Sequence, residues 1–241
     1  MRFGSIEFSP SRWPSLITLI MLGILMSLGF WQLDRAEQKQ LLLAEFQGGG
    51  EGSPFRLDET IKSFDGLQYQ FASAVGSYDA KRQILHDNRT HNGVAGYHIL
   101  TPLHLAGSDR AVLVNRGWVP LGVSRDQLPD NPVSEVEREV IGRLKKATQE
   151  DFRLGDEELR QGWPYRIQHI DTDMLGDELG YRLMPVVLLL NPDESDGFYR
   201  EWHPMTFGPE RNLGYAVQWF GLALALAIIY LAVNIHRVKQ P

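Results

Sequence analysis

Histidine is the side chain best suited to metal binding and proton transfer near neutral pH, and this chain has seven. They are His86, His91, His98, His104, His169, His203 and His236. None of them shows the i, i+4 spacing of a helical zinc pair, and the chain has no His-Glu-x-x-His motif. His98 and His104 share parity in one predicted strand, but their six-residue separation corresponds to roughly 20 Å. The spacing therefore favours structural or solvent-exposed histidines over a metal or proton-transfer site.

Other catalytic motifs are also absent from the sequence. The chain has no cysteine, which excludes disulfides, thiolate metal sites and cysteine nucleophiles. It has no Gly-x-Ser-x-Gly elbow, Walker loop or dinucleotide-binding glycine fingerprint. Two groups of carboxylates, Asp156-Glu157-Glu158 and Asp171-x-Asp173, fall where loops or helix starts are predicted, and acids stabilise a helix start without catalysing anything. We therefore predict that the protein is not an enzyme.

Two long stretches without Asp, Glu, Lys or Arg lie near the two ends of the chain, at Ser15 to Leu33 and Leu213 to Ile235. As helices they would reach roughly 28 and 34 Å, against about 30 Å for the hydrocarbon core of a bilayer. Two spans that bracket one polar segment place both termini on one side of a membrane and the segment on the other. The sequence predicts a membrane-tethered domain in contact with the lipid bilayer.

Charge predicts the orientation of these spans. The short tails carry Arg2, Arg12, Arg237 and Lys239, whereas residues 34–212 carry 20 Lys and Arg against 29 Asp and Glu, a net charge of −9. Short basic tails stay cytoplasmic, while long acidic domains are translocated. A cleaved signal peptide is the alternative for the first stretch, but its length and the absence of a small-residue cleavage site favour a retained span.

With no Arg-rich transit peptide, these features predict a multi-pass protein of the bacterial inner membrane. Its predicted parts are a cytoplasmic tail at 1–14, a span at 15–33, a periplasmic domain at 34–212, a second span at 213–235 and a cytoplasmic tail at 236–241. An acidic exported domain makes nucleic acid an unsuitable partner.

The segment between the spans is dominated by strand signals. A charged helix over 34–47 is predicted to continue the first span until Gly48, and a brief helix is predicted over 172–179. Loops are expected at 88–93, 123–136 and 192–211. The predicted strands are 69–75, 82–87, 96–105, 110–119, 139–145, 165–170 and 183–190. The fold class is therefore two transmembrane helices flanking a β-rich antiparallel barrel or sandwich with a minor helix.

The two spans carry faces with distinct side chains. In the second, Gly214, Gln218, Gly221 and Ala225 fall on one helical face, with Tyr215 and Trp219 along its edge. A face of small residues lets a helix approach closely, and Gln218 could hydrogen-bond across the contact. This face packs either on the first span or on another protein or a flat apolar ligand. At the first span, Gln32, Arg35 and Lys39 align at i, i+3, i+7, which favours anchoring of the helix end at the membrane interface.

Several motifs then occur in a fixed order from residue 28 to about 230. They are Leu28-Gly29-Phe30-Trp31-Gln32-Leu33-Asp34-Arg35 with Lys39, Gly76-Ser77-Tyr78, Gly96-Tyr97, Thr101-Pro102-Leu103, Val114-Asn115-Arg116-Gly117-Trp118-Val119-Pro120 and Asn212-Leu213-Gly214-Tyr215-Ala216-Val217-Gln218-Trp219-Phe220. With these motifs and its two-span layout, the chain resembles the surfeit-locus (Surf/Shy) family of cytochrome c oxidase biogenesis proteins.

The resemblance implies a membrane-anchored assembly factor for haem–copper cytochrome c oxidase that helps form the haem a centre of subunit I. The implied partners are subunit I and other oxidase assembly factors, and the implied cofactor is transiently held haem a. The family usually has a histidine, the obvious axial ligand, where this chain has Asn212. Asparagine is a poor haem ligand, so histidine-ligated haem binding does not carry over to this chain, while the assembly role does not depend on it.

The same resemblance suggests a set of site residues. Tyr215, Trp219 and Trp31 would stack on a porphyrin face, and Arg35, Arg211 or Arg116 would pair with its propionates, because a guanidinium binds a carboxylate bidentately. Arg116 continues the alternation of a predicted strand, which favours a role in the β core, and Gly117 marks a bulge or a close backbone approach.

Two other function classes remain open. One is a membrane-tethered chaperone or scaffold of a respiratory complex without haem contact. The other is a periplasmic hydrolase or haem-modifying enzyme that uses the region from His86 to His104.

Overall fold

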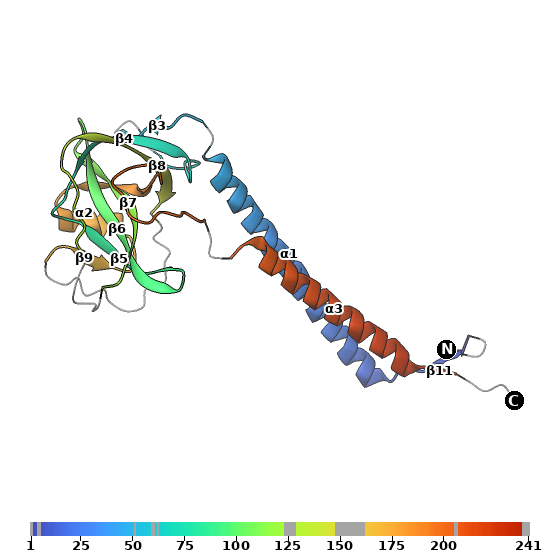
Figure 1. Ribbon diagram of the computed structural model, residues 1–241. Helices are drawn as coiled ribbons and strands as arrows, with labels where there is room; N and C mark the ends of the chain where they lie inside the picture. The colour runs from blue at the N-terminus through green and yellow to red at the C-terminus, as the bar shows by residue number, and fades with distance from the viewer. Residues whose placement is uncertain are drawn as a thin grey trace. The chain divides into compact units, whose positions relative to one another are not determined.

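The structure is a computed structural model that describes residues 2–3, 6–50, 52–58, 61, 63–122, 129–147, 162–204 and 207–237. The chain divides into two compact units. One combines Met1–Ala44 with Pro204–Pro241, and the other is Glu45–His203 (Figure 1). The carboxylates at 156–158 and part of the expected loop at 123–136 lie outside the described residues.

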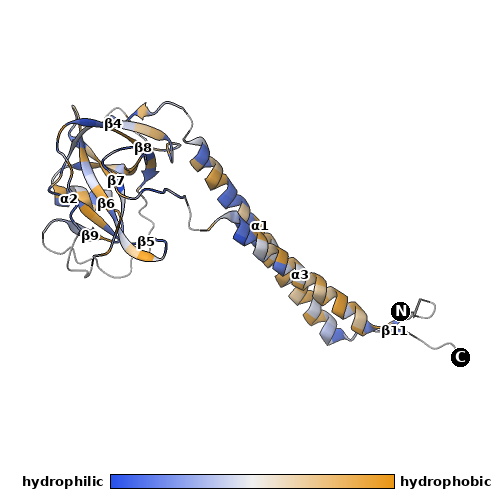
Figure 2. Cartoon of the chain, in the orientation of Figure 1, coloured by the Kyte–Doolittle hydropathy of each residue, from blue (hydrophilic) through white to orange (hydrophobic). Residues whose placement is uncertain are grey.

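Two long helices form most of the first unit: α1, Arg12–Gly48, and α3, Pro209–Asn234. Both are long and apolar enough to cross a membrane, and Figure 2 shows hydrophobic residues along most of their length. As predicted, the charged segment after residue 33 continues the first helix to the glycine run. α3 begins four residues before the predicted span, because Gly208 is its N-cap and Pro209 suits the first helical position.

The two helices run antiparallel and contact each other through narrow rows of side chains. The Ser15 hydroxyl near the start of α1 lies 2.6 Å from the Tyr230 hydroxyl near the end of α3. The rings of Phe30 and Phe220 meet edge to face at 5.3 Å. Buried residues are Leu25, Gly29, Gln32 and Ala36 on α1, and Pro209, Ala216, Ala223 and Asn234 on α3. The spacings of three and four residues on α1, and of seven from Pro209 to Ala223 on α3, are typical of helices in lengthwise contact.

Of the two alternatives for the small-residue face of α3, packing on α1 is ruled out. Gly214, Gln218, Gly221 and Ala225 are all exposed, and a Cβ atom at either glycine would meet nothing within 4 Å. α3 instead packs on α1 through Ala216, which is 1% exposed, and through Ala223. The helix carries small residues on two faces, so residue size alone did not distinguish them. Contact of the exposed face with another molecule stays a prediction.

Short strands join the two ends of the first unit. β1 (Arg2–Phe3), β2 (Ile6–Phe8) and β11 (Ile235–Arg237) form a three-stranded sheet in the order β1-β2-β11. These strands fall in or beside the segments expected to be tails, where no strand was predicted.

The second unit is built on a five-stranded barrel (Figure 1). Its strands are β4 (Phe71–Tyr78), β6 (Val94–Leu105), β7 (Arg110–Pro120), β8 (Arg138–Lys146) and β10 (Arg182–Leu190). They pair in the order β4-β8-β10-β7-β6, and β6 pairs back to β4 to close the ring. This connectivity is that of a Greek-key barrel. β5 (Ile84–His91), β9 (Tyr165–Ile167) and β3 (Phe55–Arg56) extend the sheet.

A strand lies at each of the seven predicted places, although β9 ends at Ile167 and not at residue 170, whereas β3 was not predicted. The prediction of an antiparallel sheet is wrong in part, because β10 runs parallel to β7, β5 to β9 and β3 to β4. Parallel neighbours need a crossover connection, and the long segment between β7 and β10 supplies one. Its helix, α2 (Thr172–Leu179), has the predicted bounds. The Asp171 carboxylate caps it by accepting hydrogen bonds from the amides of Asp173 and Met174.

The turn expected at 88–93 is also corrected. β5 continues to His91 through a register shift at residues 86–89, where Asn88 has a φ of 57°. The reversal itself is made by Asn92 and Gly93, whose φ angles are 48° and 79°. Two successive residues with positive φ are typical of the hairpin turn that matches strand twist.

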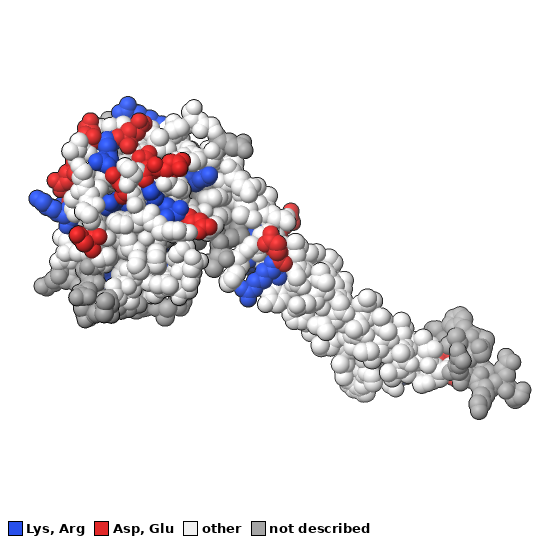
Figure 3. All heavy atoms as spheres, viewed as in Figure 1, with Lys and Arg blue, Asp and Glu red and all other residues white. Residues whose placement is uncertain are grey.

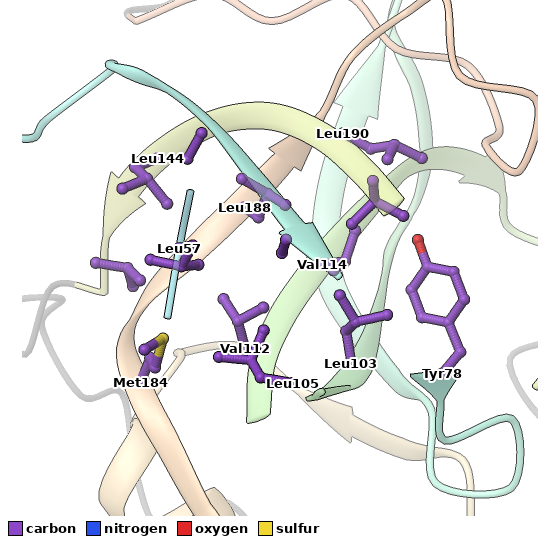
Figure 4. Close-up of a cluster of buried hydrophobic side chains, with 14 residues drawn as sticks. Leu57, Tyr78, Leu103, Leu105, Val112, Val114, Leu144, Met184, Leu188 and Leu190 are labelled. Atoms are coloured by element: carbon purple, nitrogen blue, oxygen red, sulfur yellow. The ribbon is translucent and has the colours of Figure 1, made fainter. Parts of the chain in front are cut away.

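Apolar side chains from opposite strands fill the barrel (Figure 4). The buried set is Leu57, Ala72, Ala74, Tyr78, Leu103, Leu105, Val112, Val114, Val140, Leu144, Met184, Val186, Leu188 and Leu190. Leu175 and Leu179 of α2 bury a second cluster against β10 and its neighbours. The core accounts for the strand alternation in the sequence.

Candidate functional site

A chain of hydrogen bonds joins α1 and α3 at the end of the pair where both helices lead into residues 45–203. The Asn212 amide nitrogen donates to the Gln32 Oε1 atom at 2.7 Å, and the Lys39 ammonium donates to the Asn212 Oδ1 atom at 2.8 Å. Gln32 is 9% exposed, so its polar amide needs a partner inside the helix contact. We call these three residues the clasp.

Beside the clasp, aromatic residues of the two helices share one side of the pair. Trp31 immediately precedes the buried Gln32, and Tyr215 immediately precedes the buried Ala216. Each is therefore rotated by about 100° from the helix contact. In an antiparallel pair, residues displaced in the same sense from the contact lie on the same side. Trp219, one turn after Tyr215, lies along this side as well.

The aromatic residues also lie at one depth along the helices. Gln32 contacts Asn212, and a Cβ at Gly29 would lie against the Phe220 ring. Trp31 lies between these two levels on α1, and Tyr215 and Trp219 lie between them on α3. Trp31 is 50% exposed and Tyr215 is 39% exposed, while Trp219 is half-buried. We call these three residues the aromatic face.

Cationic side chains border the aromatic face at the clasp end. The Arg35 guanidinium lies 5.8 Å from the centre of the Trp31 ring. The Arg211 guanidinium lies 5.9 Å from Tyr215 and 4.4 Å from Phe207. Both arginines are exposed, and Lys39 of the clasp lies on the same border. In the view of Figure 3, Lys and Arg lie next to Asp and Glu at this end, whereas most of the helix surface is uncharged.

This arrangement suits a flat apolar molecule that carries carboxylates. Exposed aromatic rings provide a stacking surface, and guanidinium groups pair with carboxylates through two parallel hydrogen bonds. The indole Nε1 atom of Trp219 is buried and has no hydrogen-bond partner among the described residues. The structure thus brings together five of the six predicted site residues: Trp31, Arg35, Arg211, Tyr215 and Trp219.

The sixth, Arg116, belongs to the barrel unit and is 3% exposed. Its guanidinium donates to the main-chain oxygens of Asp196 and Pro132, at 2.9 and 3.0 Å, and to the Gln83 Oε1 atom at 3.3 Å. It also lies 5.0 Å from the Phe198 ring. Burial lowers the pKa of Arg116, and the Asp196 carboxylate opposes this effect. Its propionate role stays a prediction, whereas its contacts hold the segment around Phe198 on the barrel.

The next residue shows why this strand carries a glycine. Gly117 has a φ of 116°, and a Cβ there would lie 2.7 Å from the Tyr199 carbonyl oxygen. The Trp118 amide donates to that same oxygen at 2.7 Å. The predicted close backbone approach at Gly117 is therefore confirmed, and the expected loop at 192–211 is in part a strand-like segment paired with β7.

The four histidines considered for an enzyme site, His86, His91, His98 and His104, do not come together in the barrel. His86 and His98 face each other across β5 and β6, with ring centres 6.4 Å apart. The His91 ring instead lies 3.9 Å from the Tyr199 ring at an angle of 41°, and the His104 ring meets the Tyr181 ring edge to face at 4.4 Å. Among the described residues, no three His, Cys, Asp or Glu side chains are grouped to hold a metal ion.

Burial sets the protonation of the facing pair. It is the main cause that holds the pKa of His86 well below its ordinary value, helped by Arg89. Burial, with Arg89 and Lys145, lowers the pKa of His98 to about 4. Both rings are therefore neutral at neutral pH, and nearby positive charges disfavour a bound cation.

Comparison with known proteins identifies the family. The model of the SURF1 family matches residues 19–224, from the first long helix through the barrel into the second. The chain belongs to the SURF1 family. The match includes the aromatic face, the clasp and Arg116.

Curated members of this family align over most of the chain. A SURF1-like protein of Rickettsia felis is 25% identical over 231 residues, covering 90% of this chain and 95% of the relative. Surfeit locus protein 1 of Takifugu rubripes is 24% identical over 228 residues, covering 88% and 93%. Surfeit locus protein 1 of Homo sapiens is 24% identical over 221 residues, covering 84% and 71%.

Sequence reasoning did not find the clasp. It placed Gln32 and Lys39 on one face and singled out Asn212, but it assigned no contact between them. A glutamine inside an apolar helix was the available signal, because such an amide needs a partner. The partner lies 180 residues away, and local spacing does not reveal it.

Proposed function

We propose that this protein is a membrane-anchored assembly factor for haem–copper cytochrome c oxidase that helps form the haem a centre of subunit I. Two observations support the proposal: membership of the SURF1 family, and the aromatic face with its arginines on two apolar helices. The aromatic face carries the haem part of the proposal, because it combines a stacking surface with cations at one edge.

The proposed location is the bacterial inner membrane, with both helices spanning it and the barrel on the periplasmic side. The length and composition of the helices, the basic tails and the Rickettsia relatives support this location. In this setting the arginines would lie near the lipid headgroups and the aromatic rings just below them, as is typical of interfacial side chains.

The chemistry of haem a explains what such a protein would do. The ring is large and apolar, and its propionates are charged. A protein that shields the ring on the aromatic face and pairs the propionates with Arg35 and Arg211 would keep the molecule at the membrane surface. We infer that this is the contribution of the helix pair to assembly, with oxidase subunit I and other assembly factors as partners.

The residues of the site fit one part of haem and not the other. Trp31 and Tyr215 fit the ring, and Arg35 and Arg211 fit the propionates. The iron lacks a comparable group, because both polar atoms of the Asn212 side chain are bound within the clasp. No step of the proposed function uses a protein ligand to iron.

Deletion of the gene in its host tests the assembly role. The reduced-minus-oxidised spectrum of the membranes is recorded together with oxidase activity. We expect a selective fall of the haem a signal, with b- and c-type haems unchanged. An unchanged haem a signal with normal activity would contradict the proposal.

A chaperone or scaffold without haem contact is the second candidate function. The exposed face of Gly214, Gln218, Gly221 and Ala225 favours it, because small residues around one amide suit a helix of another protein. This candidate predicts that the purified protein binds oxidase subunit I while the aromatic face can be replaced without effect. The enzyme candidate lacks support, since the described histidines form no common site.

A further inference from the structure

The hydrogen bonds of Asn212 restrict how the aromatic face can hold a metalloporphyrin. Its amide nitrogen donates to Gln32, and its carbonyl oxygen accepts from the Lys39 ammonium. Both polar atoms of the side chain are thereby used inside the helix contact. A neutral amide that is already hydrogen-bonded at both ends is a poor ligand for iron.

The other side chains around the face do not replace it. Met26 lies six positions before Gln32, which puts it about 120° from Gln32, on the side of α1 opposite to Trp31. Met21 lies ten residues before Trp31, about 15 Å farther along the helix. The indole of Trp219 has no lone pair to offer. Among the three residues of the aromatic face, Tyr215 alone carries an oxygen that could approach a metal. A neutral phenol is a weak ligand.

We propose that the aromatic face recognises a flat tetrapyrrole dicarboxylate by its ring and its carboxylates, independently of the metal. This inference rests on the proposed haem-handling function and deepens it. Recognition comes from stacking on Trp31 and Tyr215 and from pairing with Arg35 and Arg211. A molecule stacked on the aromatic face would keep its other face open to the ligands of a receiving protein, so hand-over would break no bond between this chain and the metal.

A comparison of four porphyrins with the full-length protein in lipid nanodiscs tests the inference. The probes are iron(III), zinc(II) and metal-free protoporphyrin IX, together with the dimethyl ester of the zinc compound. Quenching of tryptophan fluorescence measures each dissociation constant against empty nanodiscs. We expect the three free acids to bind within threefold of one another, and the ester at least tenfold more weakly, since it cannot pair with guanidinium groups.

Variants locate the binding. The double substitution Trp31→Ala with Tyr215→Ala is expected to weaken all three free acids in parallel by at least tenfold. Val217→Ala is the control. Val217 is 71% exposed and lies one position after Ala216, so it faces the side of the helix pair opposite to the aromatic face. Asn212→His, which puts an imidazole in place of the bound amide, is expected to make binding iron-selective by tenfold or more, with a shifted Soret band.

Two results would overturn the inference, and they differ in what else they overturn. Wild-type protein that prefers the iron compound tenfold or more, with a ligand-shifted Soret band, would show an axial ligand and would leave the proposed function standing. Loss of that preference in Tyr215→Phe would identify the ligand. Absence of binding by all four porphyrins above empty nanodiscs would contradict the haem contact of the proposed function as well.

Discussion

Gly29 of α1 lies directly against the ring of Phe220 on α3, so that a Cβ at residue 29 would be 2.5 Å from a ring carbon. This contact fixes how closely the two helices approach beside the aromatic face. Helices in lipid depend on such close packing, because burial of apolar surface gives them little reason to associate.

Replacement of Gly29 by alanine is expected to loosen the helix pair. The added methyl group displaces the Phe220 ring, and overpacking of this kind costs about 1–3 kcal/mol in free energy of unfolding. Unfolding in mixed detergent micelles, followed by circular dichroism, measures the change. Gly23→Ala is the matched control, since a Cβ at Gly23 would meet nothing within 4 Å, and it should be neutral or stabilising. Equal effects of the two substitutions would contradict the packing described here.

The clasp makes a second prediction about the same helix pair. Asn212→Ala removes the hydrogen bonds to Gln32 and Lys39, and should lower the free energy of unfolding by about 0.6–2 kcal/mol, the values found for interhelical hydrogen bonds in membranes. The same detergent titration measures it. Gln218→Ala, at an exposed amide of α3, should change the value by less than about 0.5 kcal/mol. A larger loss for Gln218→Ala than for Asn212→Ala would reject the clasp as the polar link between the helices.

Arg116 provides a prediction for the barrel. Arg116→Lys keeps the charge but cannot reproduce the planar guanidinium that reaches Asp196, Pro132 and Gln83. Buried acceptors left without donors should destabilise the barrel by about 2–3 kcal/mol. Thermal unfolding of the full chain, followed by near-ultraviolet circular dichroism, reports the change. Arg182→Lys, at an exposed position on β10, serves as the control. Unchanged barrel stability combined with lost porphyrin binding would instead assign Arg116 to the ligand.

The facing histidines predict a pH dependence of stability. The pKa of His98 is lowered to about 4 in the folded chain, while a free histidine has a pKa of about 6.5. The unfolded chain therefore binds a proton more readily between these values. The contribution of His98 to the free energy of unfolding is therefore fully present above about pH 6.5. It is lost as the pH falls toward 4, and the loss is at most about 3 kcal/mol.

Urea unfolding at several pH values measures this dependence. His98→Gln can still accept the hydrogen bond from Asn115 and should make the fall between pH 6.5 and 4 shallower, with the remaining fall due to His86, whose pKa burial also lowers. His203→Gln, at an exposed histidine, should leave the fall as in the wild type. Identical pH profiles for wild type and His98→Gln would show that His98 does not titrate with unfolding.

Much of the fold followed from local patterns. The uncharged stretches predicted α1 and α3, alternation predicted the main strands, and Asp171 and Gly180 bracket the predicted helix α2. The parallel pairing of β7 with β10 could not be predicted, because alternation shows which face of a strand is buried and not which strand lies beside it.

The candidate site, too, could be predicted in part from the sequence. Trp31, Arg35, Tyr215 and Trp219 were named from the sequence as a set, and the structure shows why they share one side of the helix pair. Trp31 and Tyr215 each lie one position before a buried residue of the helix contact, and Arg35 and Trp219 each lie three positions after it. Arg116 was named with them from a motif, yet its contacts lie within the barrel, since a motif does not say where a side chain points. The clasp depends on residues 180 positions apart, which only the folded chain brings together.

The most direct test of the central claim is complementation of the gene deletion by an altered aromatic face. Wild-type protein and the double variant Trp31→Ala with Tyr215→Ala are expressed at equal levels in the deletion strain, and reduced-minus-oxidised spectra of the membranes are compared. We predict that the wild type restores the haem a signal and that the double variant does not, with b- and c-type haems equal in both. Full restoration of the haem a signal by the double variant would contradict the account.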